Sequence, residues 1–137
     1  MKGCSITEEN RQLVGFSGNE EEYLLIPDVI LMDGEECSVE SVGMAAFEHC
    51  HRLKTVVIFE GVCEIGSYAF AHCRNLNSIT LPRSLVWIGA EAFFDCPRGL
   101  KILYAGTKNE WLGITGILAA SFPNDTVVEC SDSWSGR

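Results

Sequence analysis

The sequence contains no long hydrophobic run. Hydrophobic residues make up 47% of the 137 residues, which excludes a disordered chain, but no apolar stretch approaches the ~18 residues that span a bilayer. The first ten residues also lack the apolar segment of a secretory signal. We therefore expect no membrane insertion. We expect either a cytoplasmic protein, or a cell-surface or secreted protein whose signal lies outside this chain.

Basic residues are scarce, with 10 Lys and Arg against 19 Asp and Glu and a net charge of −9. Residues 1–64 carry 13 acidic and 4 basic side chains, whereas residues 65–137 carry 6 of each. A nucleic-acid partner requires the opposite sign, so DNA and RNA are disfavoured. We interpret the acidic runs as solvated surface; the alternative is a patch that meets a basic partner.

Common catalytic motifs are missing as well. The sequence has no G-x-S-x-G, P-loop, G-x-G-x-x-G or H-E-x-x-H pattern. Its 7 cysteines are odd in number and include no C-x-x-C pair, which favours reduced thiols over a disulfide framework. We therefore expect no enzyme and no cofactor.

What the sequence does contain is a 23-residue repeat, in the blocks 36–58, 59–81 and 82–104. Phenylalanines and cysteines fall in register at Phe47, Phe70 and Phe93 and at Cys50, Cys73 and Cys96. Such self-similarity is typical of a solenoid. Each coil should hold one parallel strand at its end, a glycine that releases the chain from extended geometry, and a short helical turn over the A-A-F-x-x-C segment.

The flanking segments are predicted to cap this solenoid within one domain, residues 1–137. Residues 1–35 form the N-terminal cap: strands at 5–7 and 12–16, a turn at 17–20, a strand at 23–26, and a loop over 28–38 that leads into the repeats. Residues 105–131 form the C-terminal cap, in which Trp111 plugs the core, 112–120 fold as a short helix or turn, and 126–130 are the last strand. Residues 132–137 are a frayed tail.

These motifs resemble the BspA-type leucine-rich repeat. The pattern I-G-x-x-A-F-x-x-C-x-x-L-x-x-I-x-L-P is complete from Ile65 to Pro82, and the segments at 24–27 and 104–111 are similar to the entry strand and the closing Y-x-G-T-x-x-x-W. The resemblance implies an α/β leucine-rich-repeat solenoid that serves as a non-catalytic protein-interaction module. Related repeat proteins include bacterial surface adhesins that engage host matrix proteins.

The strongest chemical candidates are His49-Cys50-His51 and His72-Cys73. One period apart, His49 and His72 should stack at about the ~4.8 Å strand spacing, close enough to share a metal ion. The cysteines face the core, however, and the third repeat carries Asp95 instead of histidine, so we expect no metal site. A cysteine nucleophile served by these histidines is disfavoured further, and parallel cysteines should remain free thiols.

Binding is expected on the concave strand face, whose area of about 400 Å² is below the ~800 Å² per partner of a stable interface. The candidate contact residues are Lys54, Thr55, Val57, Asn77, Ser78, Thr80, Trp87, Leu100, Lys101 and Leu103. Trp87 is either an exposed anchor or packed against a neighbouring coil. The first hypothesis is an interaction module with an unknown protein partner. The alternative is a structural module that self-associates weakly, its acidic half meeting basic residues of another copy.

Overall fold

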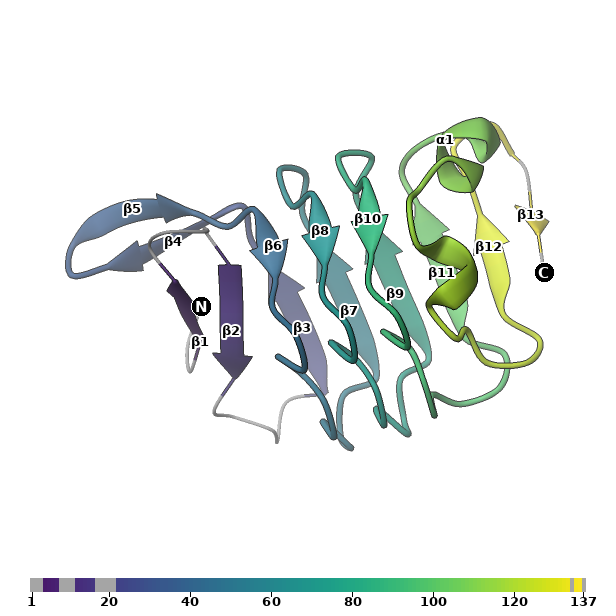
Figure 1. Ribbon diagram of the computed structural model, residues 1–137, viewed down its shortest axis with the longest axis horizontal. Coiled ribbons are helices and arrows are strands. Elements are labelled where there is room, and N and C mark those ends of the chain that lie inside the picture. Colours follow the sequence, from purple (N-terminus) through teal and green to yellow (C-terminus); the bar gives the residue numbers. More distant parts are fainter. Residues whose placement is uncertain (1–3, 8–11, 17–21, 134, 137) are drawn as a thin grey trace.

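The computed structural model describes residues 4–7, 12–16, 22–133 and 135–136. Most of its strands form two mainly parallel sheets around a single core, and successive coils follow one another along the long axis of the molecule (Figure 1). The six-stranded sheet contains, in spatial order, β13 (Ser135–Gly136), β12 (Val127–Glu129), β11 (Lys101–Tyr104), β9 (Ser78–Leu81), β7 (Thr55–Ile58) and β3 (Tyr23–Ile26). The five-stranded sheet contains β1 (Cys4–Thr7), β2 (Gln12–Phe16), β6 (Ser41–Val42), β8 (Glu64–Ile65) and β10 (Trp87–Ile88).

The register of the strands confirms the 23-residue period. Thr55 of β7 pairs with Ser78 of β9, which in turn pairs with Lys101 of β11, each 23 residues further along the chain. Ser41 and Glu64 pair in the same way between the short strands β6 and β8. The predicted α/β solenoid of stacked parallel coils is therefore confirmed, with about four turns and few helices.

The core consists of the side-chain columns that the repeat predicts. Phe47, Phe70 and Phe93 are fully buried and stack with ring centroids 5.4 and 5.7 Å apart. A fourth ring, Phe122 of the C-terminal segment, continues the column at 5.1 Å from Phe93. Since each coil leaves its apolar face open until the next coil covers it, this column connects the repeats to the cap.

The A-A-F-x-x-C segments are not the short helical turns expected from the sequence. They are chains of β-turns in which Ala45 and His49 have φ of 58° and 63°, and the later repeats have the same positive φ at the equivalent positions. Alternate N–H groups bond the next coil, as from Phe47 to the Ala69 carbonyl at 2.8 Å, so they cannot form helical bonds within their own coil. The glycines before these segments, such as Gly66, do not have positive φ. Close packing between coils explains these glycines better than the release from extended geometry expected from the sequence.

The N-terminal strands belong to the solenoid as well as capping it. The predicted pair of strands forms β1 and β2, which are antiparallel. β2 also pairs in parallel with β6, and β3 pairs in parallel with β7, so residues 12–26 include both strands of an additional coil. The turn expected at residues 17–20 lies outside the described residues.

The loop expected over residues 28–38 is instead a β-hairpin. β4 (Val29–Met32) and β5 (Glu35–Ser38) are antiparallel, and the hairpin projects from the N-terminal part of the molecule (Figure 1). Asp33 and Gly34 connect them with φ of 53° and 83°, as a type I′ turn requires. The Asp-Gly dipeptide was the sequence signal for this hairpin.

The C-terminal cap closes the other end of the core. Trp111 of α1 (Lys108–Leu112) is buried and lies between Tyr104 and Phe122, as a plug should. The column of the short strands continues through Thr115, which bridges Trp87, and not through Trp111, although Trp111 follows Ile88 by one 23-residue period.

The rest of the cap is η1 (Ile117–Ala119) and the predicted last strand, β12. The tail predicted to fray contributes β13, antiparallel to β12. The longest helix in the described part of the chain has five residues, so none of its helices could cross a membrane.

Candidate functional site

The outward side chains of the parallel strands in the six-stranded sheet form one surface, which we call the long-strand face. Its members are Tyr23, Leu25, Thr55, Val57, Ser78, Thr80, Lys101, Leu103, Val127 and Glu129. They are exposed or half-buried, and they alternate with buried core residues along each strand. The strand register arranges them in two rows across the sheet, one beginning at Tyr23 and the other at Leu25.

The β3 end of this face is apolar. Tyr23 is 56% exposed and Leu25 44% exposed, and Leu25 lies beside Val57 in the register of β3 and β7. Neither residue was among the predicted contacts, because their strand was assigned to a cap outside the 23-residue repeat. The alternation of exposed and buried residues in Tyr-Leu-Leu-Ile was the available signal.

The lysines at the rim of the face form surface ion pairs. Lys54 Nζ lies 3.6 Å from a carboxylate oxygen of Glu22, and Lys101 Nζ lies 3.5 Å from one of Glu129. Each of these side chains is about half exposed, and such pairs contribute little to stability. The lysines therefore remain able to exchange these partners for a carboxylate of another protein.

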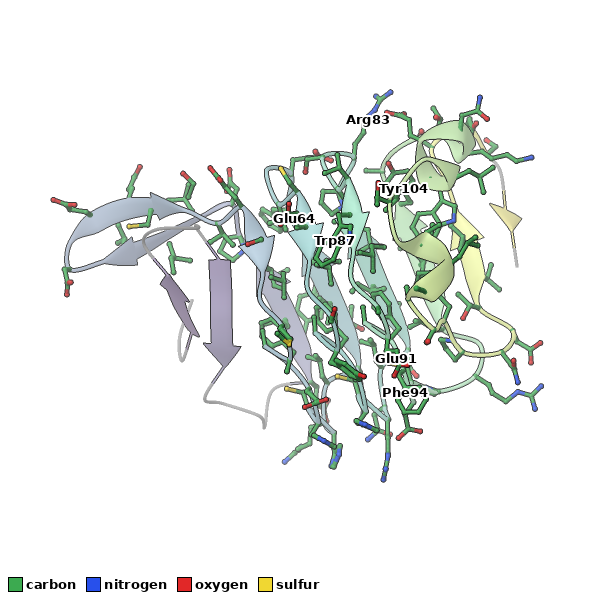
Figure 2. All side chains as sticks on the ribbon, viewed as in Figure 1. Glu64, Arg83, Trp87, Glu91, Phe94 and Tyr104 are labelled. Atoms are coloured by element: carbon green, nitrogen blue, oxygen red, sulfur yellow. The ribbon has the colours of Figure 1, made fainter. Side chains whose placement is uncertain are left out.

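Two of the predicted contact residues lie away from this face. Leu100 is fully buried, because Gly99 before it adopts φ of 77° and the leucine enters the core. Trp87 lies on β10 in the opposite sheet, beside Glu64 (Figure 2), and is half-buried. The structure does bring together Thr55, Val57, Ser78, Thr80, Lys101 and Leu103 on the face, with the exposed Lys54 and Asn77 directly before their strands.

The cysteine column is part of the core, as expected. Cys50, Cys73 and Cys96 are buried free thiols, and the Cys73 and Cys96 thiols each donate a hydrogen bond to a backbone carbonyl 3.2 Å away. Burial raises the pKa of the Cys73 thiol and raises that of Cys96 to about 12. Thiols held in this way are poor nucleophiles, because the thiolate is the reactive form.

The histidines lie on the turn edge of the solenoid, where the centroid of the His72 ring is 5.5 Å from that of the ring of Phe94, which Figure 2 labels. The His49 and His72 rings are stacked, with centroids 4.5 Å apart and planes 5° apart, which confirms the predicted stacking. Asp95 occupies the same place in the next coil, and its carboxylate accepts hydrogen bonds from His72 Nδ1 at 2.8 Å and from Arg74 Nε at 3.1 Å. These bonds, the one from His72 first, lower the pKa of Asp95.

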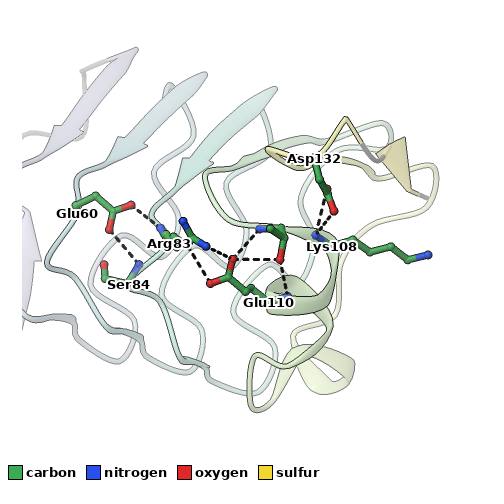
Figure 3. A network of polar contacts seen from close by, with 7 residues as sticks. Glu60, Arg83, Ser84, Lys108, Glu110 and Asp132 are labelled. Atoms are coloured by element: carbon green, nitrogen blue, oxygen red, sulfur yellow. Dashed lines mark hydrogen bonds and ion pairs between the residues drawn. The ribbon is translucent and has the colours of Figure 1, made fainter.

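A polar network joins the last repeat to the cap (Figure 3). Arg83 Nε donates to the Glu110 carboxylate at 2.9 Å, and Glu60 accepts from the backbone N–H groups of Arg83 and Ser84. Thr107 and Glu110 form a capping box at the start of α1. All of these contacts hold the fold together, and we assign them no role in binding.

The C-terminal end also carries an open apolar groove, lined among others by Trp111, Leu112, Leu118 and Phe122. Leu118 is 99% exposed and Leu112 58% exposed. An exposed leucine beside an apolar groove is a candidate contact with a second protein surface.

Comparison with known proteins finds a matching family model and solved structures of similar architecture. Residues 36–111 match the family model described as "BspA type Leucine rich repeat region (6 copies)". A leucine rich cell surface protein from Faecalibacterium prausnitzii A2-165 has a similar structure, with a TM-score of 0.59 and 20% identity over 95% of this chain and 41% of that one. The leucine-rich repeat protein of T. pallidum has a TM-score of 0.57 and 22% identity over 93% of this chain and 61% of that one.

This chain thus spans less than two thirds of the length of either solved protein. At these identities the likeness establishes the fold alone. No curated protein has a significantly similar sequence.

Proposed function

The chain belongs to the BspA-type leucine-rich repeat family, and we propose that it is a non-catalytic protein-interaction module that binds its partner through the long-strand face. The observation that carries this proposal is the exposed apolar end of that face. Tyr23, Leu25 and Val57 lie side by side on adjacent strands, where a purely solvated sheet face would carry polar side chains.

The partner that fits this face is a protein surface with apolar side chains at one end and acidic side chains beside them. The apolar side chains would meet Tyr23 and Leu25, and the acidic ones would replace Glu22 and Glu129 as partners of Lys54 and Lys101. We propose an adhesin-like interaction with a partner outside the cell, which the cell surface protein among the structural neighbours supports.

The size of the face limits the affinity of this interaction. Five parallel strands ~4.8 Å apart, each about four residues long, present roughly 300–400 Å², against ~800 Å² per partner in a stable interface. Binding through this face alone should therefore be weak. Several copies, or a longer solenoid that contains this chain, would raise the avidity without any new type of contact.

The first prediction tests the face by substitution of Leu25. Immobilised protein is incubated with an extracellular-matrix extract and with a bacterial cell extract, and retained partners are identified by mass spectrometry. Leu25→Glu should lose a partner that the unsubstituted chain retains, because a carboxylate in an apolar contact must be desolvated. Val86→Glu is the matched control, since Val86 is 58% exposed and directly precedes β10 in the opposite sheet. Equal recovery with both variants would place the binding surface elsewhere.

A second candidate function is self-assembly, which the exposed Leu118 and its groove favour. In this case the C-terminal end of one copy contacts another copy, and the contact is apolar. The predicted self-association through acidic and basic residues remains a separate form of the same proposal. The two forms differ in their response to salt, because only the charged contact is screened.

A further inference from the structure

The turn edge brings three possible metal ligands together in the described part of the chain. Glu48, His49 and His72 each offer one ligand atom, and these three atoms all lie within 4.8 Å of one another. Glu48 and His72 are half-buried and His49 is exposed, so an ion could approach from solvent. No metal site was expected here, because the cysteines face inward and the third repeat carries Asp95 instead of histidine. The cysteines do face inward, but this cluster does not need them.

The backbone explains why these side chains meet. His49, His72 and Asp95 occupy the left-handed position of successive coils, with φ of 63°, 60° and 61°. Histidine and aspartate are among the residues that tolerate this conformation, which accounts for them individually. Identical backbone geometry in neighbouring coils then stacks the side chains. This identical backbone geometry does not explain why the carboxylate of Glu48 lies beside the two imidazoles.

The hydrogen bond from His72 to Asp95 is an independent observation that points to a metal. An ionised carboxylate only accepts hydrogen bonds, so His72 Nδ1 donates the 2.8 Å bond and carries the proton. Nε2 of the neutral ring is then left with a lone pair that can bind an ion. Histidines that bind metals usually donate their other N–H to a carboxylate or carbonyl in this way, which fixes the tautomer and the ring orientation.

We propose that Glu48, His49 and His72 bind one divalent transition-metal ion, with Asp95 as the positioning residue that orients His72. Two imidazoles and a carboxylate favour zinc or nickel over magnesium or calcium, which prefer oxygen ligands alone. This site lies on the turn edge, apart from the long-strand face, and does not depend on the proposed binding function.

The geometry also predicts what must move when the ion binds. Tetrahedral zinc with bonds of ~2.0–2.1 Å places its ligand atoms roughly 3.3 Å apart, closer than the 4.8 Å limit within which these three lie. The lone pairs of the two stacked rings lie in nearly parallel planes, so one ring must rotate toward the other. His72 is held by Asp95, whereas His49 is exposed, and His49 is therefore the ligand that rotates.

The test is calorimetric titration of zinc into the full chain without an affinity tag at neutral pH. All proteins carry Cys4→Ser and Cys63→Ser, so that zinc binding to these thiols is not measured. The ligand variants are His49→Asn and His72→Asn, because asparagine tolerates the left-handed backbone. Asp95→Asn tests the positioning residue, and asparagine is used there too because it tolerates the left-handed backbone. His51→Asn is the matched control: this exposed histidine neighbours His49, with ring centroids 5.8 Å apart, but lies outside the ligand cluster.

We expect one zinc ion per chain with micromolar affinity. His49→Asn and His72→Asn should each abolish the heat, Asp95→Asn should weaken binding about tenfold, and His51→Asn should leave it unchanged. Zinc should also raise the Tm of the unsubstituted chain and not that of His72→Asn, since only the folded state assembles the site. No heat at micromolar zinc, or equal binding by His72→Asn, would overturn the proposal. Equal loss with His51→Asn would also overturn it, because binding would then be a general property of exposed histidines.

Discussion

At the scale of single residues, the space between coils decides what each position tolerates. A Cβ atom on Gly66 would lie 2.6 Å from the backbone nitrogen of Met44 and 2.7 Å from the carbonyl carbon of Gly43. These are backbone atoms of the preceding coil, so the clash cannot be relieved by rotating a side chain. Glycine is therefore needed here for the approach of two coils.

The residue-scale prediction is that Gly66→Ala destabilises the protein by about 1–3 kcal/mol, the usual cost of overpacking. Gly113→Ala is the control, because its φ is −87° and its nearest contact from a Cβ would be 3.4 Å. Urea unfolding followed by circular dichroism measures both changes in the free energy of unfolding. A loss of the same size in both variants would show that coil packing is not the reason for Gly66.

At the scale of elements, the contact between the last repeat and α1 depends on the ion pair between Arg83 and Glu110. The hydrogen bond from Arg83 and then the capping box with Thr107 lower the pKa of Glu110 from 4.5 to about 2. A carboxylate with a lowered pKa in the folded state stabilises that state when it is ionised. Its contribution is complete above pH 4.5 and is lost as the pH falls toward 2.

The element-scale prediction follows because ionised Glu110 stabilises the folded state. Glu110→Gln should melt at a lower temperature than the unsubstituted chain at neutral pH, and the difference should shrink between pH 4.5 and 2, where the unsubstituted chain loses the contribution as well. Glu36→Gln, on the exposed hairpin strand β5, controls for the removal of one negative charge. Thermal melts from neutral to acid pH measure the difference. A difference that stays constant down to pH 2 would contradict the assignment.

At the scale of the whole molecule, the two ends of the solenoid differ in the surroundings of their exposed leucines. The C-terminal end presents Leu118 beside the apolar groove, whereas the hairpin at the other end presents its single leucine, Leu31, which is 71% exposed. The charge is also unequal, because the acidic excess lies in residues 1–64. Contact between two copies could therefore be apolar at one end or charged between the two halves.

The whole-molecule prediction is that self-association is weak and apolar. Light scattering should give the 15.1 kDa of one chain at low concentration and a rising mass at high concentration, in low and high salt alike. Leu118→Glu should keep the single-chain mass throughout, and Leu31→Glu, the control, should behave as the unsubstituted chain. A mass of 15.1 kDa at every concentration would exclude self-assembly through Leu118, and association lost in high salt would favour the charged form.

The repeat made much of this fold predictable. A strict period places equivalent residues in equivalent surroundings, so the Phe47 and Cys50 columns, the parallel strands and the stacked histidines follow from spacing alone. Predictions outside the period succeeded where a local signal was strong, as for the strand that ends before Pro27 and the plug at Trp111.

The candidate site was predictable only in part, because the face of a residue depends on its local backbone. Leu100 was assigned to the surface by counting from neighbouring coils, but the left-handed Gly99 rotates it into the core. Tyr23 and Leu25 reach the long-strand face only because β3 pairs with β7.

By itself, the sequence determined the 23-residue coil, the inward columns and the repeat family, because these depend on the identity and spacing of residues along the chain. The tertiary structure alone decided that the turns are not helical, that β2 and β3 belong to the solenoid, and that Glu48 and Asp95 join the two histidines. Those outcomes depend on hydrogen bonds between coils, which compete with the hydrogen bonds within a coil. The sequence of one repeat does not show which of these bonds form.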